Sequence, residues 1–224
     1  AKWAGVSGAD LRRRSRLRAL VPDEAEWKRL AASRPNAFFT TVPIVRAMWE
    51  GVRRLGVGAL NHIRMLETSA GSGRFLGLQP TDMSAKSRRT AIELDVVTGE
   101  LLKKLYQNAD VQIVGFEKAR IPDNSIDIAI SNVPFGDYPV SDPRFKKFPQ
   151  VRAAIHNYFF AKALDKVRPG GIIAFITSNG TMDAQGNLGA RRYIAERSDL
   201  LLAVRLPKGA FPATEVITAI IFLR

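Results

Sequence analysis

The sequence predicts an α/β protein with a doubly wound, mostly parallel β-sheet, and three observations lead to this fold class. Short apolar runs rich in β-branched residues, such as residues 126–130, alternate with longer amphipathic segments, as in β-α-β units. A Gly-Ser-Gly turn at 71–73 follows the first of these runs. A polar turn that begins at Asn132 follows the run at 126–130, at the sheet edge where such folds bind ligands.

Composition limits the classes of function. Shares of 46% hydrophobic and 25% charged residues in a chain of 224 are typical of a globular protein with a buried core. The absence of cysteine excludes disulfides and thiolate metal sites, and two histidines are too few to suggest a metal centre. No apolar run reaches the length of a membrane span. A net charge of +13 favours a polyanionic partner, nucleic acid more than an anionic membrane, over a solvated basic face.

Residues 1–35 are predicted to form a basic helical extension ahead of the main domain, residues 36–224. The arginines from Arg12 to Arg18 lie in a segment with a thin stripe of leucines, and a second helix pattern begins at Pro22. This basic segment suits nucleic acid or an acidic neighbour as well as it suits a solvated helix.

The glycine turn follows the first strand of the main domain. We expect a helix at 44–55, introduced by Pro43, and then a strand at 62–66 that runs into the turn. Glycines there let the backbone approach a ligand closely. A dinucleotide fingerprint would need a third glycine where Leu76 stands, and the Gly-Lys-Ser/Thr of a P-loop does not follow. The turn therefore predicts a ligand other than a nicotinamide dinucleotide.

Acidic residues follow the next two strands. The second strand, expected at 90–92, ends at Glu93, about twenty residues after the glycine turn, where an acid commonly binds ribose hydroxyls. A stray surface glutamate is the alternative interpretation. The third strand, expected at 111–114, is followed by Phe116 and Glu117. These placements favour a ligand that contains a nucleoside.

The four residues from Asn132 onward carry the chemistry of the central turn. Asn132 offers a side-chain carbonyl, and Pro134 biases Val133 towards an extended backbone that can direct its carbonyl oxygen. Phe135 offers a flat ring for stacking. Two acceptors and a stacking ring suit a planar substrate that carries an amino group. The ordinary alternative is a strand that simply ends in a proline turn.

Four stretches in this order resemble the motifs of amino-group, S-adenosylmethionine-dependent DNA methyltransferases. Residues 38–40 with Pro43 resemble the upstream FFTP motif, residues 66–75 the LEPSAGTGRF loop, Glu93 the ribose acid, and residues 132–135 the catalytic NPPF or NPPY. Residues 115–117, 122–138 and 156–183 also resemble methylase segments of very large helicase–methylase proteins of phages and mobile elements. The resemblance implies a Rossmann-like methyltransferase fold, with a seven-stranded, mostly parallel sheet and an antiparallel last strand.

The resemblance also implies roles for individual residues. The expected cofactor contacts are Phe39, Thr40, Glu67, Ser69, Ala70, Gly71, Gly73, Phe75, Glu93, Leu94, Phe116, Glu117 and Asn132. The expected catalytic residues are Asn132, Val133, Pro134 and Phe135. Val133 stands where the family has its first proline. Because that position contributes a backbone carbonyl, which any residue has, we expect catalysis to survive and Val133→Pro to be tolerated or to improve activity.

The remaining chain completes the sheet. A loop at 142–149 interleaves basic and aromatic residues beside the site. Its Arg144, Lys146 and Lys147 are expected to contact phosphates around an extruded base, with a solvated charge run as the alternative. Further helices are expected at 157–167 and 188–197, and further strands at 172–177, 200–206 and 216–223.

Together these inferences predict an enzyme that transfers a methyl group from S-adenosylmethionine to the N6 amine of adenine in DNA, as one domain of a larger protein. Additional domains or a subunit would supply recognition of the target sequence. The expected location is cytoplasmic, bacterial or phage-associated, with neither a metal nor a membrane involved. The alternatives are methylation of RNA or of protein glutamine, and a non-catalytic methyltransferase-like module that positions DNA for a helicase.

Overall fold

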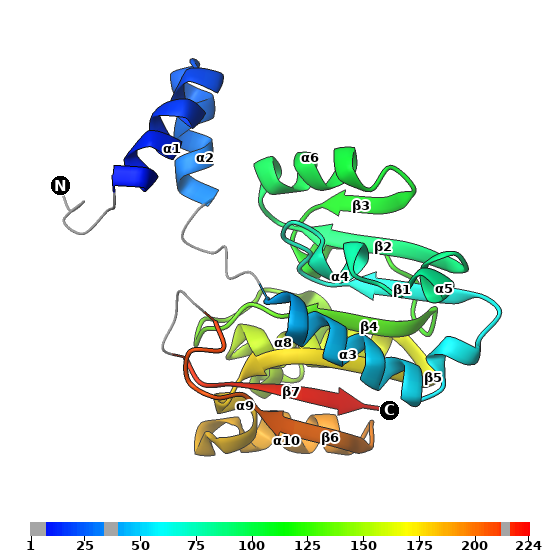
Figure 1. Ribbon diagram of the computed structural model, residues 1–224. Helices are drawn as coiled ribbons and strands as arrows, with labels where there is room; N and C mark the ends of the chain where they lie inside the picture. Colours follow the sequence, from blue (N-terminus) through cyan, green and yellow to red (C-terminus); the bar gives the residue numbers. More distant parts are fainter. Residues whose placement is uncertain (1–7, 34–39, 212–215) are drawn as a thin grey trace. The chain divides into compact units, whose positions relative to one another are not determined.

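The chain forms two compact units, Ala1–Ala37 and Phe38–Arg224. The computed structural model describes residues 8–33, 40–211 and 216–224 (Figure 1). Among these described residues, the first unit consists of helices, and the second unit holds the whole β-sheet.

Two helices, α1 (Gly8–Leu20) and α2 (Glu24–Ser33), form the described part of the first unit. Arg18, near the end of α1, pairs with Glu24 at 2.7 Å. Its guanidinium also lies over the Trp27 ring, 5.3 Å from the ring centroid. Part of the arginine cluster therefore holds the two helices together, because a guanidinium stacked on an aromatic face is stabilised by the ring.

Seven strands form one sheet in the second unit: β1 (Ile63–Glu67), β2 (Ser87–Glu93), β3 (Ala109–Ile113), β4 (Ile126–Asn132), β5 (Val167–Ser178), β6 (Leu200–Arg205) and β7 (Thr218–Leu223). Their order across the sheet is β3-β2-β1-β4-β5-β7-β6 (Figure 1). Pairing is parallel from β3 to β5, whereas β7 is antiparallel to both β5 and β6. This arrangement confirms the predicted seven-stranded, doubly wound sheet with an antiparallel last strand.

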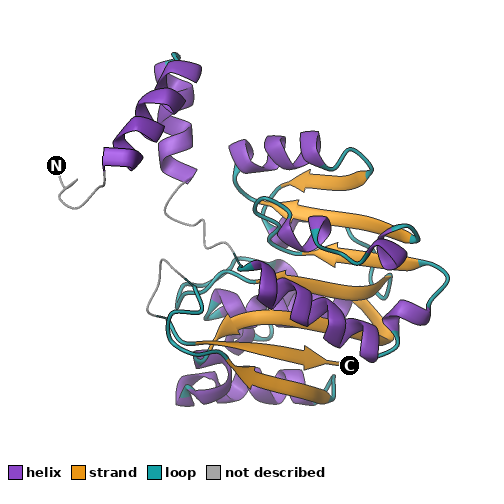
Figure 2. Cartoon of the chain, viewed as in Figure 1, coloured by secondary structure: helices purple, strands orange, loops and turns teal. Residues whose placement is uncertain are grey.

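Helices cover both faces of the sheet (Figure 2). They are α3 (Val42–Arg54), α4 (Arg74–Gly77), α5 (Thr81–Ser84), α6 (Val96–Leu105), α7 (Pro149–Arg152), α8 (Ile155–Lys166), α9 (Gly180–Asp183) and α10 (Leu188–Ala195). Short 3-10 turns are η2 (Val57–Ala59), η3 (Phe116–Lys118), η4 (Pro143–Phe145) and η5 (Gln185–Asn187). Helix α3 forms as expected, because Pro43 lies in its first turn and its buried residues recur at helical spacing.

Two apolar cores lie on opposite faces of the sheet, because successive strand residues point to opposite sides. Along β4, Ile128 and Ile130 belong to one core and Ala129 to the other. The core of Ile128 includes residues of α3 to α6, and the core of Ala129 includes residues of α7, α8 and α10. With both faces covered, ligands can reach the sheet only at its ends or edges.

Strand β5 begins earlier than the sequence predicts. Val167 pairs with Ile126, and the next pair is Ile128 with Ile172, so the chain between them bulges out of the ladder. Gly170 makes this bulge possible with a φ of +75°, a backbone conformation that other residues adopt at a cost. The Pro-Gly-Gly segment therefore lies within the strand and does not separate it from α8.

Candidate active site

The central turn begins where β4 ends, between its neighbours β1 and β5. Asn132 is the last residue of β4 and pairs with Ile176 of β5. The backbone N–H of Val133 then donates to the Ile176 carbonyl at 3.0 Å, and the Val133 side chain is buried in the core. Phe135 packs against both apolar cores while keeping part of its surface exposed. The sheet thus fixes the backbone from which the predicted catalytic residues project.

Ser69 joins the glycine-rich loop to the central turn. Its hydroxyl donates to the backbone carbonyl of Asn132 at 2.8 Å. It also lies 2.9 Å from the Ser131 hydroxyl, which accepts the Ser69 backbone N–H at 3.3 Å. The loop after β1 and the turn after β4 are therefore held together directly. Sequence reasoning missed Ser131, although a serine at the end of an otherwise apolar buried strand was the available signal.

Glu93 organises the glycine turn from the end of β2. Its two carboxylate oxygens accept the backbone N–H of Gly71 at 2.6 Å and that of Asp95 at 2.8 Å. Burial raises the pKa of Glu93, while these backbone hydrogen bonds act in the opposite direction. Leu94, the next residue, is 74% exposed. The predicted ribose acid therefore lies against the glycine turn, with an exposed apolar side chain beside it.

Glycine is required at two positions of the turn for different reasons. Gly71 and Gly73 have φ values of +53° and +75°. A Cβ on Gly73 would collide with the side chains of Tyr106 and Leu102, whereas nothing lies within 4 Å of a Cβ on Gly71. Gly73 is thus covered by the protein, and Gly71 faces open space into which a ligand can come close to the backbone.

Glu67, at the end of β1, is buried beneath the loop. Burial raises the pKa of its carboxyl well above the usual range, against backbone hydrogen bonds from Leu76 and Phe75 and together with the charge of Glu93. Its Oε2 atom has no hydrogen-bond partner among the described residues. This geometry places Glu67 under the loop, where it supports the turn that starts α4.

The segment ahead of α3 is tied to the same loop. Arg74 donates to the Thr40 carbonyl at 2.6 Å, and the Trp49 indole donates to the Phe75 carbonyl at 3.0 Å. Phe39, predicted to contact the cofactor, lies outside the described residues. The Phe75 ring is buried in the core, so contact with a ligand from this residue would have to come from its backbone.

Phe116 is also a core residue. Its ring centroid lies 5.1 Å from that of Phe159 and 6.4 Å from that of Tyr158, both on α8. The backbone carbonyl of the following residue, Glu117, accepts a hydrogen bond from the buried Lys162 at 2.8 Å. Sequence reasoning missed Lys162, because one lysine in an amphipathic helix carries no signal of burial.

The basic loop after the central turn is anchored at two points. Asp142 is buried and accepts from the Tyr158 hydroxyl at 2.7 Å. Arg144 pairs with Asp123 at 2.7 Å and with Asp165 at 2.8 Å, and these bonds raise its pKa. The Nη1 atom of Arg144 therefore contacts two protein carboxylates, while 43% of the side chain stays exposed. Lys146 and Lys147 are exposed, and their contact with phosphates stays a prediction.

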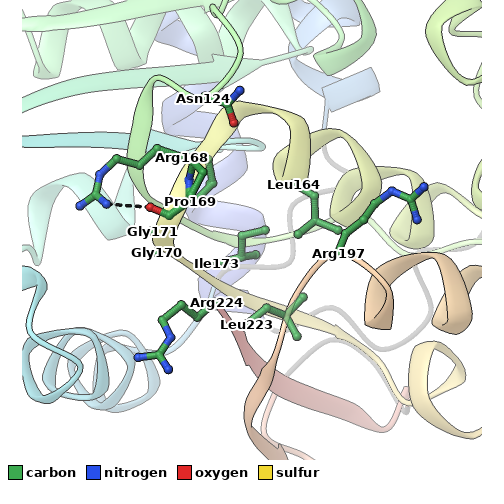
Figure 3. A pocket seen from close by; sticks show the side chains of 11 residues that line it. Asn124, Leu164, Arg168, Pro169, Gly170, Gly171, Ile173, Arg197, Leu223 and Arg224 are labelled. Carbon is green, nitrogen blue, oxygen red and sulfur yellow. Dashed lines mark hydrogen bonds between the residues drawn. The ribbon is translucent and has the colours of Figure 1, made fainter.

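A cavity of about 340 Å³ lies elsewhere, near the start of β5 (Figure 3). It is lined by Arg168, Leu223 and neighbouring residues, and Arg168 donates to the Pro169 carbonyl at 2.9 Å. Asn132 pairs with Ile176 towards the other end of β5. The cavity is thus separate from the residues that the sequence predicts to bind ligands.

Residues 8–33, 40–211 and 216–224 contain no group of three or more His, Cys, Asp or Glu side chains arranged to hold a metal ion. In the same ranges, no helix combines the length and apolar character needed to cross a membrane.

The chain resembles known proteins over most of its length. A family model described as N-6 DNA Methylase matches residues 101–224. The chain is 29% identical over 193 residues to the Defense against restriction protein B of Escherichia phage P1, which amounts to 84% of the chain and 8% of that protein. It is 26% identical over 213 residues to the Type II methyltransferase M.XamI of Xanthomonas campestris pv. amaranthicola, or 86% of the chain and 40% of that protein. The chain therefore spans less than half the length of either relative.

Solved structures share the fold. The methyltransferase subunit of a type I restriction-modification system from Streptococcus thermophilus superposes with a TM-score of 0.69 at 17% identity. The match covers 84% of this chain and 44% of that subunit. It confirms that the sheet and its helices form the methyltransferase variant of the Rossmann-like fold.

Proposed function

The chain belongs to the N-6 DNA methylase family, and from that membership we propose that it transfers a methyl group from S-adenosylmethionine to the N6 amine of adenine in DNA. The observation that carries the proposal is the junction at Ser69. Its hydroxyl donates to the Asn132 carbonyl at 2.8 Å and so holds the glycine loop against the central turn. A methyl donor bound on the glycine loop and a methyl acceptor bound at the central turn would meet at this junction, and such positioning supplies much of the catalysis.

The residues present fit S-adenosylmethionine. The open space at Gly71 admits a ligand close to the backbone, and Glu93 supplies a carboxylate beside it for ribose hydroxyls. Leu94 offers an exposed apolar side chain for a nucleobase. When bound, S-adenosylmethionine supplies a methyl group that is already activated on a positively charged sulfur. The protein therefore has to bind and orient its substrates, and the proposal assigns it no strong general base.

Asn132, Val133 and Phe135 would hold the target base. The amino lone pair of adenine is delocalised into the ring, which makes the amine a poor nucleophile. Oxygen acceptors from the Asn132 side chain and the Val133 backbone would take the amine hydrogens and direct the lone pair. Stacking on Phe135 would offset the cost of extruding the base, on the order of a few kcal/mol.

DNA binding is assigned to the exposed cations near this turn. Lys146 and Lys147 extend from a loop anchored by Asp142, and the chain carries a net charge of +13. Arg144 anchors the loop through two carboxylates and, with 43% of its side chain exposed, is proposed to contact phosphate as well. Since both relatives are much longer than this chain, we propose that further domains or a subunit recognise the target sequence. We also propose that the enzyme acts in the cytoplasm, where bacterial or phage DNA is found.

Transfer of a labelled methyl group tests the proposal. The protein is incubated with labelled S-adenosylmethionine and with DNA, RNA or protein, and the modified nucleoside or amino acid is identified. We expect label at adenine N6 in DNA, with Asn132→Ala reducing turnover at least about 100-fold, as for other residues that position a reacting group. Asn108→Ala, at an exposed turn before β3, is the matched control. Full methylation by Asn132→Ala contradicts the assignment.

The same assay separates the alternatives. Label in RNA or in glutamine would show that the substrate is RNA or protein instead of DNA, with S-adenosylmethionine still as the methyl donor. Calorimetry with S-adenosylhomocysteine covers the remaining alternative, because a module that only positions DNA would show neither binding nor turnover.

A further inference from the structure

Lys162 is a buried lysine on α8 that the proposed chemistry does not use. Only 4% of its surface is exposed. Its ammonium group donates to Asp142 at 3.1 Å and to the Glu117 carbonyl at 2.8 Å. It also lies over the rings of Phe116, at 5.4 Å, and Tyr158, at 5.8 Å. Two oxygen acceptors from distant parts of the chain thus meet at one buried cation.

One acceptor belongs to the loop on the substrate side. Asp142 comes ten residues after Asn132 and caps η4 by accepting the Arg144 backbone N–H at 3.0 Å. The Tyr158 hydroxyl donates to the same carboxylate oxygen that Lys162 contacts, at 2.7 Å. These bonds fix the start of the loop that carries the exposed Lys146 and Lys147.

The other acceptor belongs to the cofactor side. The Glu117 carbonyl lies in η3, which follows β3. Ile113, the last residue of β3, pairs with Glu93 of β2. Lys162 therefore connects the strand end beside Glu93 with the loop that follows the central turn.

Stability alone does not account for a lysine at this place. Removing an ammonium group from water is costly, and apolar residues of similar volume often serve a buried position as well as an ion pair does. What the charge adds is a geometric constraint. If either acceptor moved, the ammonium would lose a hydrogen bond that water cannot replace.

We propose that Lys162 is a positioning residue that couples cofactor binding beside Glu93, at the strand ends next to η3, to DNA binding at the loop 142–148. The inference rests on the proposed function, which places the cofactor beside Glu93 and DNA at Lys146 and Lys147. A ligand that fixes η3 also fixes the position of the ammonium, and with it Asp142. Coupling of this kind is reciprocal, so each ligand tightens the binding of the other by the same factor.

Binding measurements test the coupling without relying on turnover. Calorimetry gives the affinity for S-adenosylhomocysteine with and without a short duplex that contains one mismatched adenine, which is easier to extrude. Fluorescence anisotropy gives the affinity for the labelled duplex with and without S-adenosylhomocysteine. In the wild type we expect the same factor in both directions, of roughly 5-fold or more.

Three variants isolate the role of Lys162. Lys162→Met removes the charge, and Lys162→Met with Asp142→Asn removes both charges, so that no lone carboxylate is left buried. Lys166→Met is the matched control, because Lys166 is a buried lysine one turn further along α8 that pairs with Asp123 at 2.6 Å. Asp123 keeps Arg144 as a partner in that variant.

The two Lys162 variants should bind each ligand but show a coupling factor near 1, while Lys166→Met keeps the wild-type factor. Coupling that survives in the double variant, or that Lys166→Met abolishes equally, overturns the proposal. A wild type that binds both ligands independently also overturns it and leaves the proposed function intact. A wild type that does not bind S-adenosylhomocysteine refutes the proposed function itself.

Discussion

Val133 stands where the methyltransferase motif carries a proline, and its backbone N–H has a partner. That N–H donates to the Ile176 carbonyl at 3.0 Å, one step beyond the last pair of the β4–β5 ladder. A proline has no N–H to donate. The expectation that Val133→Pro is harmless considered only the carbonyl of this residue, and the structure adds the donor to the argument.

Val133→Pro should therefore lower the free energy of unfolding by about 1–3 kcal/mol, because the buried Ile176 carbonyl loses its donor. Urea denaturation of the wild type and the variant measures the change. Val133→Ala is the control, since it shortens the same buried side chain and keeps the N–H. A Val133→Pro protein as stable as the wild type would show that the Ile176 bond contributes nothing.

For single residues, the sequence predicted the position in the fold better than the direction in which the side chain points. Asn132 and Glu93 were placed at strand ends because the preceding apolar runs are short and clear. The Phe116 ring faces the core because Tyr158 and Phe159 cover it. Those residues are more than forty positions away, and no local pattern reports such a contact. The roles of the site residues in binding and catalysis stay predictions.

Among the elements, the turn between β1 and α4 shows how one short segment can serve two purposes. Its Gly71 end faces open space, and its Gly73 end is packed under α6 and the residue that follows it. The Tyr106 hydroxyl donates to the Gly73 carbonyl at 2.9 Å. The packed Gly73 end therefore holds the Gly71 end, which faces open space, in place.

Alanine substitutions should separate the two halves. Gly71→Ala incurs only the cost of a positive φ, about 1–2 kcal/mol. Gly73→Ala adds a collision with Tyr106 and Leu102, and overpacking costs about 1–3 kcal/mol more. Chemical denaturation of both variants compares the losses directly, with each serving as the control for the other. Equal losses would mean that Tyr106 and Leu102 move aside without cost.

The boundaries of β4 and β6 were predicted to within two residues, whereas β2 begins at Ser87, three residues before its predicted start, and β5 begins at Val167, five residues before its predicted start. The Pro-Gly-Gly segment after α8 reads as a loop, yet β5 already pairs with β4 at Val167. A bulge depends on the partner strand, since only the register across the ladder reveals the extra residues. The number of strands and the antiparallel last strand, by contrast, followed from the family resemblance.

For the molecule as a whole, one buried carboxylate predicts sensitivity to acid. Asp127 accepts hydrogen bonds from Arg64 at 2.9 Å and from Arg168 at 2.5 Å. Burial raises its pKa, but these bonds outweigh burial and lower the pKa from 3.8 to about 2. The ionised form is therefore favoured in the folded state. Its contribution is complete above the unfolded pKa, near pH 4, and is lost as the pH falls towards 2.

The contribution of Asp127 should be at most about 2 kcal/mol, because both arginines are partly exposed to solvent. Urea unfolding at a series of pH values between 5 and about 2 measures the loss. Asp127→Asn should flatten this part of the profile, whereas Asp110→Asn, at an exposed position on β3, should not. Identical profiles for the wild type and Asp127→Asn would exclude Asp127 as the source.

The net charge of the chain predicts that DNA binding weakens steeply with salt. Each phosphate contact contributes roughly −0.9 to the slope of log affinity against log salt concentration. Lys146→Ala and Lys147→Ala should each make the slope shallower by about that amount. Lys103→Ala is the control and should leave the slope unchanged, because this exposed lysine of α6 pairs with Glu100 at 3.2 Å and no phosphate contact is assigned to it. Binding that salt does not affect would contradict the electrostatic origin.

The insertion of β7 between β5 and β6 has a consequence for biosynthesis. Strand β6 is made before β7, yet among the described strands it pairs with β7 alone. A growing chain that has passed Arg205 therefore carries a strand without a neighbour, and β5 keeps one edge open. Open edges recruit strands from other molecules. The period before β7 leaves the ribosome is thus the time when this half of the sheet most needs protection, for example by a chaperone.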